Sequence, residues 1–303
     1  LFGAFVRGLH HWGASAMVVA IGLHMLQVFL YGAYKPPREA MWIVGVLLLL
    51  LTMGFAFTGY LLPWDQNAYW ATQVGINMVG SVPFVGTFLV KVMRGGEMLG
   101  ALTLSRFFAV HVLFLPATIA VLVALHMFIL RRVGPAGPWS GGLDRRGKRP
   151  ESSPSPPRPE GQPSPPGGER RARRSEPFYP RQVFMDAVVM LGVFAVVATL
   201  ALTISFPLTD KANPSDHSFV PVPEWYFLFY YQFLKYMEGP ILGPIAAWVI
   251  PGGFITLLLA LPFLDPSKDR APSSRRAVLG LGALFLVGVF GLVGLSLHDL
   301  QAM

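Results

Sequence analysis

Two apolar stretches long enough to cross a bilayer each hold a pair of histidines, and this feature restricts the chain more than any other. The first stretch runs from His10 to Tyr31 and contains His10 and His24, fourteen residues apart. At about 100° and about 1.5 Å per residue, the two imidazoles return to within about 40° of one helix face, about 21 Å apart along the axis. One helix face therefore carries imidazoles at two membrane depths.

The second stretch, FFAVHVLFLPATIAVLVALHMFIL, repeats this arrangement with His111 and His126, fifteen residues apart. In an ideal helix these two lie about 60° and about 22 Å apart. Two antiparallel helices with such pairs would place His10 opposite His111 and His24 opposite His126. Because a buried imidazole needs a partner and a haem iron accepts one from each side, we predict two stacked bis-histidine haems.

Other histidines in the chain favour a different interpretation. A single histidine in a membrane helix is more often a packing residue or a member of a proton relay, and we interpret His11 in this way because His10 is better placed. His217 lies in a polar loop away from membrane depth, which excludes it as a haem ligand. The nearly equal spacing of the two pairs is what favours ligation for the other four.

The composition indicates a membrane protein. The 303 residues are 53% hydrophobic and only 13% charged, with a mean hydropathy of +0.52. With no cysteine, these residues cannot form a disulfide, bind an iron-sulfur cluster through thiolates or attach a c-type haem covalently. The net charge of +8 would suggest nucleic acid in a soluble protein, but its distribution indicates membrane topology instead.

These patterns predict an all-α integral membrane protein, a transmembrane helical bundle that holds two stacked haems. Six spans are expected, at 12–31, 40–61, 106–130, 183–205, 242–264 and 276–297. Of the 24 Lys and Arg residues, 18 lie on one side of this bundle, which assigns that side to the cytoplasm. Since Leu1 is not an initiator methionine, we expect a preceding helix to be missing.

The chain divides into two membrane modules. Residues 134–180 change abruptly to Pro, Gly, Ser and Arg, a composition that cannot bury a core, so we predict a disordered cytoplasmic linker. This linker separates a haem-binding module at 1–133 from a second module at 181–303. After Pro63, a broken and moderately amphipathic stretch predicts one or two short helices at the outer membrane surface.

Glycines and arginines accompany the histidines. Gly45 and Gly59 are also fourteen residues apart, so they could clear room for flat ring edges at the two histidine depths, or simply allow close helix packing. Arg7 and Arg106 precede histidines at the outer ends of their helices, and could pair with haem propionates or snorkel to the interface. Arg131 could act similarly on the inner side.

An acidic residue lies among aromatic side chains in the segment PVPEWYFLFYY. Near the outer edge of the membrane, the Glu224 carboxyl should have a raised pKa and could accept a proton from a quinol hydroxyl. The alternative is a helix N-terminal residue after Pro223 that complements the helix dipole, and both roles are compatible.

Taken together, these residues resemble the cytochrome b subunit of quinol:cytochrome c and quinol:plastocyanin oxidoreductases. The fifteen-residue histidine gap and Asp65 are similar to the chloroplast-type cytochrome b, and residues 183–297 resemble its separate subunit IV, here fused through the linker. The motifs that carry the resemblance are Arg7 with His10 and His24, Gly45 and Gly59, GYLLPWDQ at 59–66, TLSRF before His111 and His126, and PEWY at 223–226.

The resemblance implies how such a chain would work. Quinol would bind on the outer side near Glu224, with Tyr60 and Tyr226 as walls of the site. One electron would pass to a Rieske iron-sulfur protein. The other would pass through a low-potential haem on His10 and His111 to a high-potential haem on His24 and His126, with coupled proton translocation. The second haem would reduce quinone on the inner side.

The resemblance also implies the surroundings of the chain. It would lie in the inner, cytoplasmic membrane of a bacterium as a multi-pass subunit of a homodimeric complex, in contact with lipid and without nucleic acid. A c-type cytochrome subunit or a soluble carrier would accept electrons from the Rieske protein. Whether an additional c-type haem lies at the inner side stays open, because the chloroplast-type relatives hold it through a cysteine.

Two other functions would use some of these features. A di-haem membrane anchor of a dehydrogenase would only reduce quinone, and would need neither PEWY nor the outer surface helices. A transporter or proton channel would use the histidines as a relay. The paired spacing and PEWY favour quinol oxidation over both.

Overall fold

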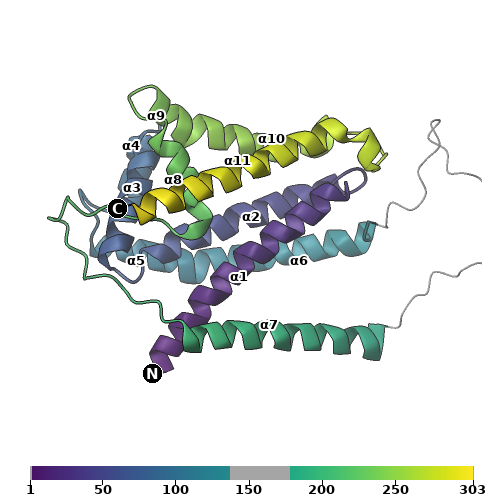
Figure 1. Cartoon of the computed structure of the whole chain (residues 1–303), viewed down its shortest axis with the longest axis horizontal. Coiled ribbons are helices and arrows are strands. Elements are labelled where there is room, and N and C mark those ends of the chain that lie inside the picture. Colours follow the sequence, from purple (N-terminus) through teal and green to yellow (C-terminus); the bar gives the residue numbers. More distant parts are fainter. Residues whose placement is uncertain (1, 137–177, 303) are drawn as a thin grey trace, which may run out of the picture. The chain divides into compact units, whose positions relative to one another are not determined.

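Long helices dominate the computed structural model, which describes residues 2–136 and 178–302 (Figure 1). Within these residues, six helices are long and apolar enough to cross a membrane. They are α1 (Phe2–Leu30), α2 (Glu39–Tyr60), the continuous run α5 (Ala101–Ala109), η1 (Val110–Phe114) and α6 (Leu115–Val133), α7 (Val183–Thr203), the run α9 (Leu242–Pro244), η4 (Ile245–Val249) and α10 (Ile250–Leu264), and α11 (Arg276–Gln301). The six predicted spans and the all-α class are therefore confirmed.

The first span begins earlier than the sequence suggested. We predicted a start near residue 12, but α1 already begins at Phe2. Apart from Arg7, residues 2–9 are apolar or glycine, and none of them is a proline that would stop a helix. A single charged residue within the first two turns does not end a helix, so the added turns follow from the sequence.

Short helices fill the connections between the spans. After Pro63 lie α3 (Gln66–Gly80) and α4 (Gly86–Arg94), which confirms the two predicted short helices. The Asp65 carboxylate caps α3 by accepting the Ala68 N–H, and Gly95 ends α4 with a φ of 74°. The remaining short elements are η2 (Phe178–Gln182), η3 (Trp225–Phe227), α8 (Leu228–Lys235) and η5 (Pro272–Ser274).

The chain folds as two compact units, which are described separately. The first consists of Leu1–Ala20 and Ser140–Phe206. In it, a Cβ added to Gly8 would lie 3.1 Å from the Ala201 Cβ, so the start of α1 approaches α7 closely. The His11 ring stacks on Phe206 with 3.8 Å between ring centroids, a packing contact. Most of the predicted linker, 137–177, lies outside the described residues.

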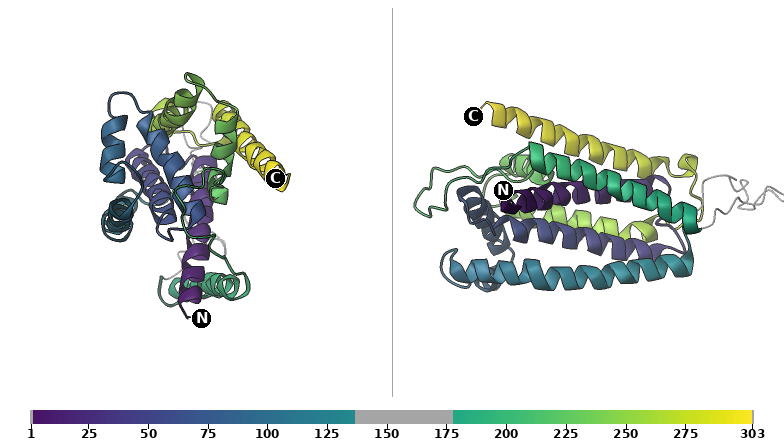
Figure 2. Two further views of the ribbon diagram at one scale, coloured as in Figure 1. Left: turned by 90° about the vertical axis from the view of Figure 1, so that its left-hand side faces the viewer. Right: turned by 90° about the horizontal axis from the view of Figure 1, so that it is seen from below.

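The second unit consists of Ile21–Trp139 and Pro207–Met303. Within it α2 packs along α6, as both views of Figure 2 allow the reader to follow, and α8 packs on α11. Two apolar cores form. One gathers around the α2–α3 connection, and its buried members are Leu61, Tyr69, Ile76, Leu99 and Phe107. The other joins the end of α1 to α2 and α10 through Tyr34, Trp42 and Val46.

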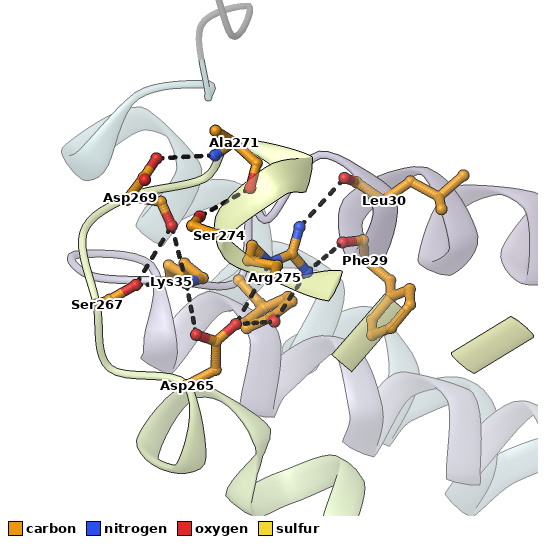
Figure 3. Close-up of polar contacts among 10 residues, drawn as sticks. Phe29, Leu30, Lys35, Asp265, Ser267, Asp269, Ala271, Ser274 and Arg275 are labelled. Carbon is orange, nitrogen blue, oxygen red and sulfur yellow. Dashed lines mark hydrogen bonds and ion pairs between the residues drawn. The ribbon is translucent and has the colours of Figure 1, made fainter. Parts of the chain in front are cut away.

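A buried ionic cluster ties the α1–α2 connection to the α10–α11 connection (Figure 3). The Lys35 ammonium lies 2.6 Å from one Asp265 oxygen, and the Arg275 Nε lies 3.3 Å from the other. Both cationic side chains are completely buried, and the carboxylate is 13% exposed. The Tyr34 hydroxyl donates to Asp265 at 2.6 Å and accepts from Arg275 at 2.9 Å.

The same arginine closes the end of α1. Its guanidinium donates to the Phe29 and Leu30 carbonyls at 2.8 and 3.2 Å, two of the four carbonyls that a helix C-terminus leaves unpaired. A cation at this end also interacts favourably with the helix dipole. The cluster therefore joins sequence-distant segments and satisfies a helix end in one set of contacts.

Replacing Asp265 with asparagine should strongly destabilise the protein. Two buried cations would lose their counter-ion, a change that typically costs about 3–5 kcal/mol. We expect a clearly lower Tm in detergent-solubilised protein. The control is Asp299→Asn, since the Asp299 pair with Lys235 spans 3.6 Å and both side chains are partly exposed, 41% and 31%. An equal shift in Tm for the two variants would contradict a structural role for the cluster.

The same contacts predict an acid limit for stability. Burial alone would raise the Asp265 pKa, but hydrogen bonds from Lys35 and Tyr34 hold this pKa below its ordinary value. A carboxyl group with a depressed folded pKa stabilises the fold above its unfolded pKa. We therefore expect the Tm difference between wild type and Asp265→Asn to be full at neutral pH and to shrink as the pH falls through that lowered pKa.

Candidate functional site

Two of the predicted histidine ligands lie together in the second unit. His126 is on α6, and its Nδ1 is buried without a hydrogen-bond partner among the described residues. His24, on the last turns of α1, is close enough to interact with it electrostatically. A Cβ added to Gly45 of α2 would lie 3.5 Å from the His126 Cε1. An imidazole with an uncommitted nitrogen thus faces a second imidazole and a glycine.

His111 lies fifteen residues before His126 in the same span and packs against α2. Its Nδ1 is 3.1 Å from the Thr58 hydroxyl oxygen, and its ring packs edge-on against Phe55, 5.3 Å between centroids. A Cβ added to Gly59 would lie 2.5 Å from the His111 Cε1, closer than real atoms approach. A side chain at this position would therefore have to displace the His111 ring. That Gly59 clears room for a flat ring edge stays a prediction. His10, its proposed partner, belongs to the first unit.

A half-buried acid and two half-buried phenols lie together in the second unit. Glu224 is the N-cap residue of η3, but its side chain makes no capping hydrogen bond. It interacts electrostatically with both Tyr60 and Tyr226. Burial raises the pKa of Glu224, as predicted from the aromatic surroundings. Burial, followed by the nearby carboxylate, also raises the pKa of Tyr226, so this phenol keeps its proton.

Asn67 of α3 holds the PVPE segment in place. Its side-chain oxygen accepts the Val222 N–H at 2.9 Å, and its NH₂ group donates to the Val222 carbonyl at 3.0 Å. It also donates to the Tyr60 hydroxyl, which in turn donates to the Val222 carbonyl at 3.1 Å. These bonds fix Tyr60 against Val222, which precedes Glu224 by two residues in the chain. Asn67 was not among the predicted site residues.

The two preceding residues fasten the loop before PEWY. Asp65 accepts the Thr209 N–H at 3.0 Å. Gln66, only 4% exposed, accepts the Asn213 N–H at 2.6 Å and donates to Asp216 at 3.0 Å. The motif LPWDQN therefore anchors a loop about 150 residues away in sequence. Three consecutive polar residues at a helix start were the available signal.

The predicted arginines have other contacts in the structure. Arg7 donates to the Phe206 carbonyl, within the first unit. Arg106 donates to the Lys91 carbonyl at 3.1 Å and to the Val92 carbonyl, and so caps the end of α4. Arg131 lies exposed in the last turn of α6. Their proposed propionate contacts remain predictions.

His217 packs against an aromatic side chain, as expected for a residue outside the haem sites. Its ring lies edge-on to Trp70, with 5.4 Å between ring centroids. Among residues 2–136 and 178–302, no group of three or more His, Cys, Asp or Glu could hold a metal ion on its own.

Comparison with known families agrees with this geometry. The family described as "Cytochrome b(N-terminal)/b6/petB" matches residues 15–213, and the family described as "Cytochrome b(C-terminal)/b6/petD" matches residues 211–301. The chain belongs to the cytochrome b family. It combines a b6-like N-terminal part with a petD-like C-terminal part, which confirms the resemblance found in the motifs. Cytochrome b proteins bind b-type haems, so the family accounts for paired histidines at membrane depth.

Individual cytochrome b relatives cover different parts of the chain. The menaquinol:cytochrome c reductase cytochrome b subunit of Geobacillus thermodenitrificans is 53% identical over 138 residues, 45% of this chain and 62% of that protein. The cytochrome bc complex cytochrome b subunit of Chlorobaculum thiosulfatiphilum is 34% identical over 276 residues, 90% of this chain and 58% of that protein. The chain thus spans less than two thirds of the length of either relative.

One solved structure has a similar fold. The structure titled "Hyperthermophilic respiratory Complex III" matches with a TM-score of 0.75 and 29% identity, over 98% of this chain and 72% of the solved one. The fold of this chain is therefore similar to that of the solved chain.

The structure describes the protein without ligands, and its residues fit a b-type haem. The fit rests on the buried His126 Nδ1, which has no hydrogen-bond partner among the described residues, and on Gly45 and Gly59, where a side chain would meet an imidazole. A flat ring between helices needs both an available nitrogen and the absence of bulk nearby. Both conditions are met at His126, and the absence of bulk is also met beside His111.

Substitution of Gly59 by alanine should lower the haem content. The added Cβ would displace His111, which it would otherwise approach to 2.5 Å. We expect the pyridine haemochrome assay to fall from two haems towards one per chain. The control is Gly54→Ala in the same helix, where the added Cβ lies 4.0 Å from Leu115, an ordinary contact. Equal haem contents in both variants would argue against the glycine requirement.

Proposed function

We propose that this chain is the di-haem cytochrome b subunit of a quinol-oxidising bc-type complex, coupled to proton translocation. The observation that carries the proposal is the double contact of residues 58–60 of α2. Thr58 and Gly59 touch the ligand candidate His111, while Tyr60 interacts with the half-buried Glu224. A redox centre and a proton acceptor at one helix end is what quinol oxidation requires, because electrons and protons leave the quinol together.

The four histidines have defined roles in this proposal. His24 and His126, which interact in the second unit, would hold the inner, high-potential haem iron. His10 and His111 would hold the outer, low-potential one, an assignment that rests on the spacing in the sequence. When bound, two b haems supply one-electron transfer between the two membrane depths. Arg7, Arg106 and Arg131 remain candidates for contacts with the haem edges.

The outer-side residues would handle the quinol proton. The Glu224 carboxylate would accept it from the substrate hydroxyl, since burial brings its pKa towards that of a useful base. Tyr226 keeps its phenolic proton, because burial raises the pKa of that phenol, and would hydrogen-bond the substrate oxygen. Tyr60, held by Asn67 and the Val222 carbonyl, would form the facing wall. Quinone would be reduced at the inner side.

The relatives support the reaction class and the setting. One is named as a subunit of a menaquinol:cytochrome c reductase and another as a subunit of a cytochrome bc complex. By extension, this chain would work in a bacterial cytoplasmic membrane with a Rieske iron-sulfur protein and a c-type cytochrome, in a homodimeric complex. Its parts would be a haem module at 1–133, a linker at 134–180 and a subunit IV-like module at 181–303.

Replacing Glu224 with glutamine should slow quinol oxidation by about 10²- to 10⁴-fold, the usual contribution of a general base. Both haems should stay bound. In the wild type, turnover should rise as the pH increases through the raised Glu224 pKa, because only the ionised carboxyl accepts a proton, and the variant should lack this rise. The control is the exposed Glu238→Gln. An unchanged pH profile in Glu224→Gln would remove the proton-acceptor role.

Replacing His24 with alanine should remove one haem and leave the other. Because the ligand pairs lie about 21 Å apart along the helices, the loss of one imidazole should not disturb the second site. Haem is counted per chain from the pyridine haemochrome spectrum. His11→Ala serves as the control, since that ring packs against aromatic side chains, stacked on Phe206 and edge-on to Trp12. Two haems in His24→Ala would refute the ligand assignment.

A further inference from the structure

The span that carries His111 and His126 is not a regular α-helix. Between α5 and α6, residues Val110–Phe114 form a π-turn. The Leu115 N–H bonds to the Val110 carbonyl, five residues back, instead of the usual four. The π-turn contains His111 itself. Such turns hold one more residue than an α-helical turn and are frequent at functional sites.

A proline marks the place where this helix opens. Pro116 follows the π-turn by two residues, has no N–H to donate and would crowd the carbonyl four residues earlier, that of Val112. The run leading to α10 contains a second example. There the π-turn Ile245–Val249, in which the Ile250 N–H bonds to Ile245, also ends two residues before a proline, Pro251.

Side-chain hydroxyls satisfy carbonyls in both π-turns. The Thr118 hydroxyl donates to the Phe114 carbonyl at 2.8 Å. The Tyr230 hydroxyl donates to the Ala246 and Ala247 carbonyls at 3.2 and 3.1 Å. A helical turn that opens within a membrane-spanning segment must have its carbonyls paired, because an unpaired one is costly there. Both π-turns are therefore supported features of the fold.

The π-turn removes a mismatch between neighbouring helices. On the unbroken helix α2, Gly59 and Gly45 are fourteen residues apart, yet they face His111 and His126, which are fifteen apart. In regular α-helices, fourteen and fifteen steps end about 100° apart in direction. Two regular helices could therefore not place both glycines of one opposite both histidines of the other. One extra residue taken up in a π-turn makes the fifteen steps equivalent to fourteen.

We propose that the π-turn at Val110–Phe114 sets the register of the haem ligands. It takes up one extra residue, so that His111 and His126 share the fourteen-residue register of α2 and of the pair His10 and His24 on α1. The π-turn is a positioning element. It acts through His111 and does not itself touch the substrate. This inference rests on the proposed function, because it concerns residues that would ligate haem.

A pair of single-residue deletions tests the proposal in the full chain within its complex. Deletion of Val112 removes the extra residue and should let the π-turn close into a regular α-helix, with the two histidines in the fourteen-residue register. Deletion of Val19 also removes one residue between paired histidines, but α1 has no π-turn that could compensate. The two valines are a matched pair, 51% and 47% exposed.

The expected result is asymmetric. The Val112 deletion should keep two haems per chain, whereas the Val19 deletion should drop to one, because His24 would turn by about 100° relative to His10. The readouts are the haem count and the redox titration of the remaining haem, and neither depends on turnover. A residue that served only to build the helix would not tolerate deletion from the middle of a membrane span.

Every other outcome overturns the inference. Loss of a haem after deletion of Val112 means that the π-turn does not compensate for the extra residue. Two haems after deletion of Val19 mean that ligand register is not limiting. The undeleted chain separates this inference from the proposed function. If the undeleted chain contains no haem, the proposed function fails. If the undeleted chain contains two haems but both deletions change the haem count equally, only the register proposal fails.

Discussion

The close approach of α2 to α6 is the contact on which the candidate site depends. At Gly59 and Gly45 the absence of a side chain allows imidazoles from α6 and its π-turn to lie directly on the α2 backbone. Inside a membrane, the hydrophobic effect contributes little to helix association, and small residues that permit close packing contribute more. The same two glycines therefore allow close packing and, in the proposed function, room for the ligands, and a side chain at Gly59 would have to displace the His111 ring.

The outer end of α2 connects the imidazole site to the residues around Glu224. Its last turn reaches Tyr60, and the next segment, LPWDQN, bonds to the loop that precedes PEWY through Asp65, Gln66 and Asn67. At the opposite end, the Lys35 and Asp265 pair joins the same two parts of the sequence. The N-terminal and C-terminal parts are thus fastened at both ends of the second unit. These bonds fix the backbone around the half-buried Glu224.

The sequence predicted the long helices because apolar length and helical periodicity are local properties. It also suggested that Gly45 and Gly59 lie at the depths of the histidines, because similar spacing on two helices is visible without knowing the fold. It missed Asn67 and Gln66, whose partners lie about 150 residues away, because no local pattern encodes such pairs. Lys35 and Arg275 are two of the 18 positive residues that assign the cytoplasmic side. The structure buries both, and a count of charges cannot reveal a buried counter-ion.

The spacing of the second histidine pair shows where ideal helix geometry misleads. Fifteen residues gave an angle of about 60°, which suggested an approximate match to the fourteen-residue pair. The fourteen-residue pair turns by about 40° in one direction and the fifteen-residue pair by about 60° in the other. A regular helix would therefore have left His111 about 100° from the direction that faces Gly59. Pro116 was visible in the sequence as a helix-perturbing residue. A proline between two ligands whose spacing is one residue too long is therefore a sequence signal for a π-turn, and the structure supplies the partner helix that makes the correction necessary.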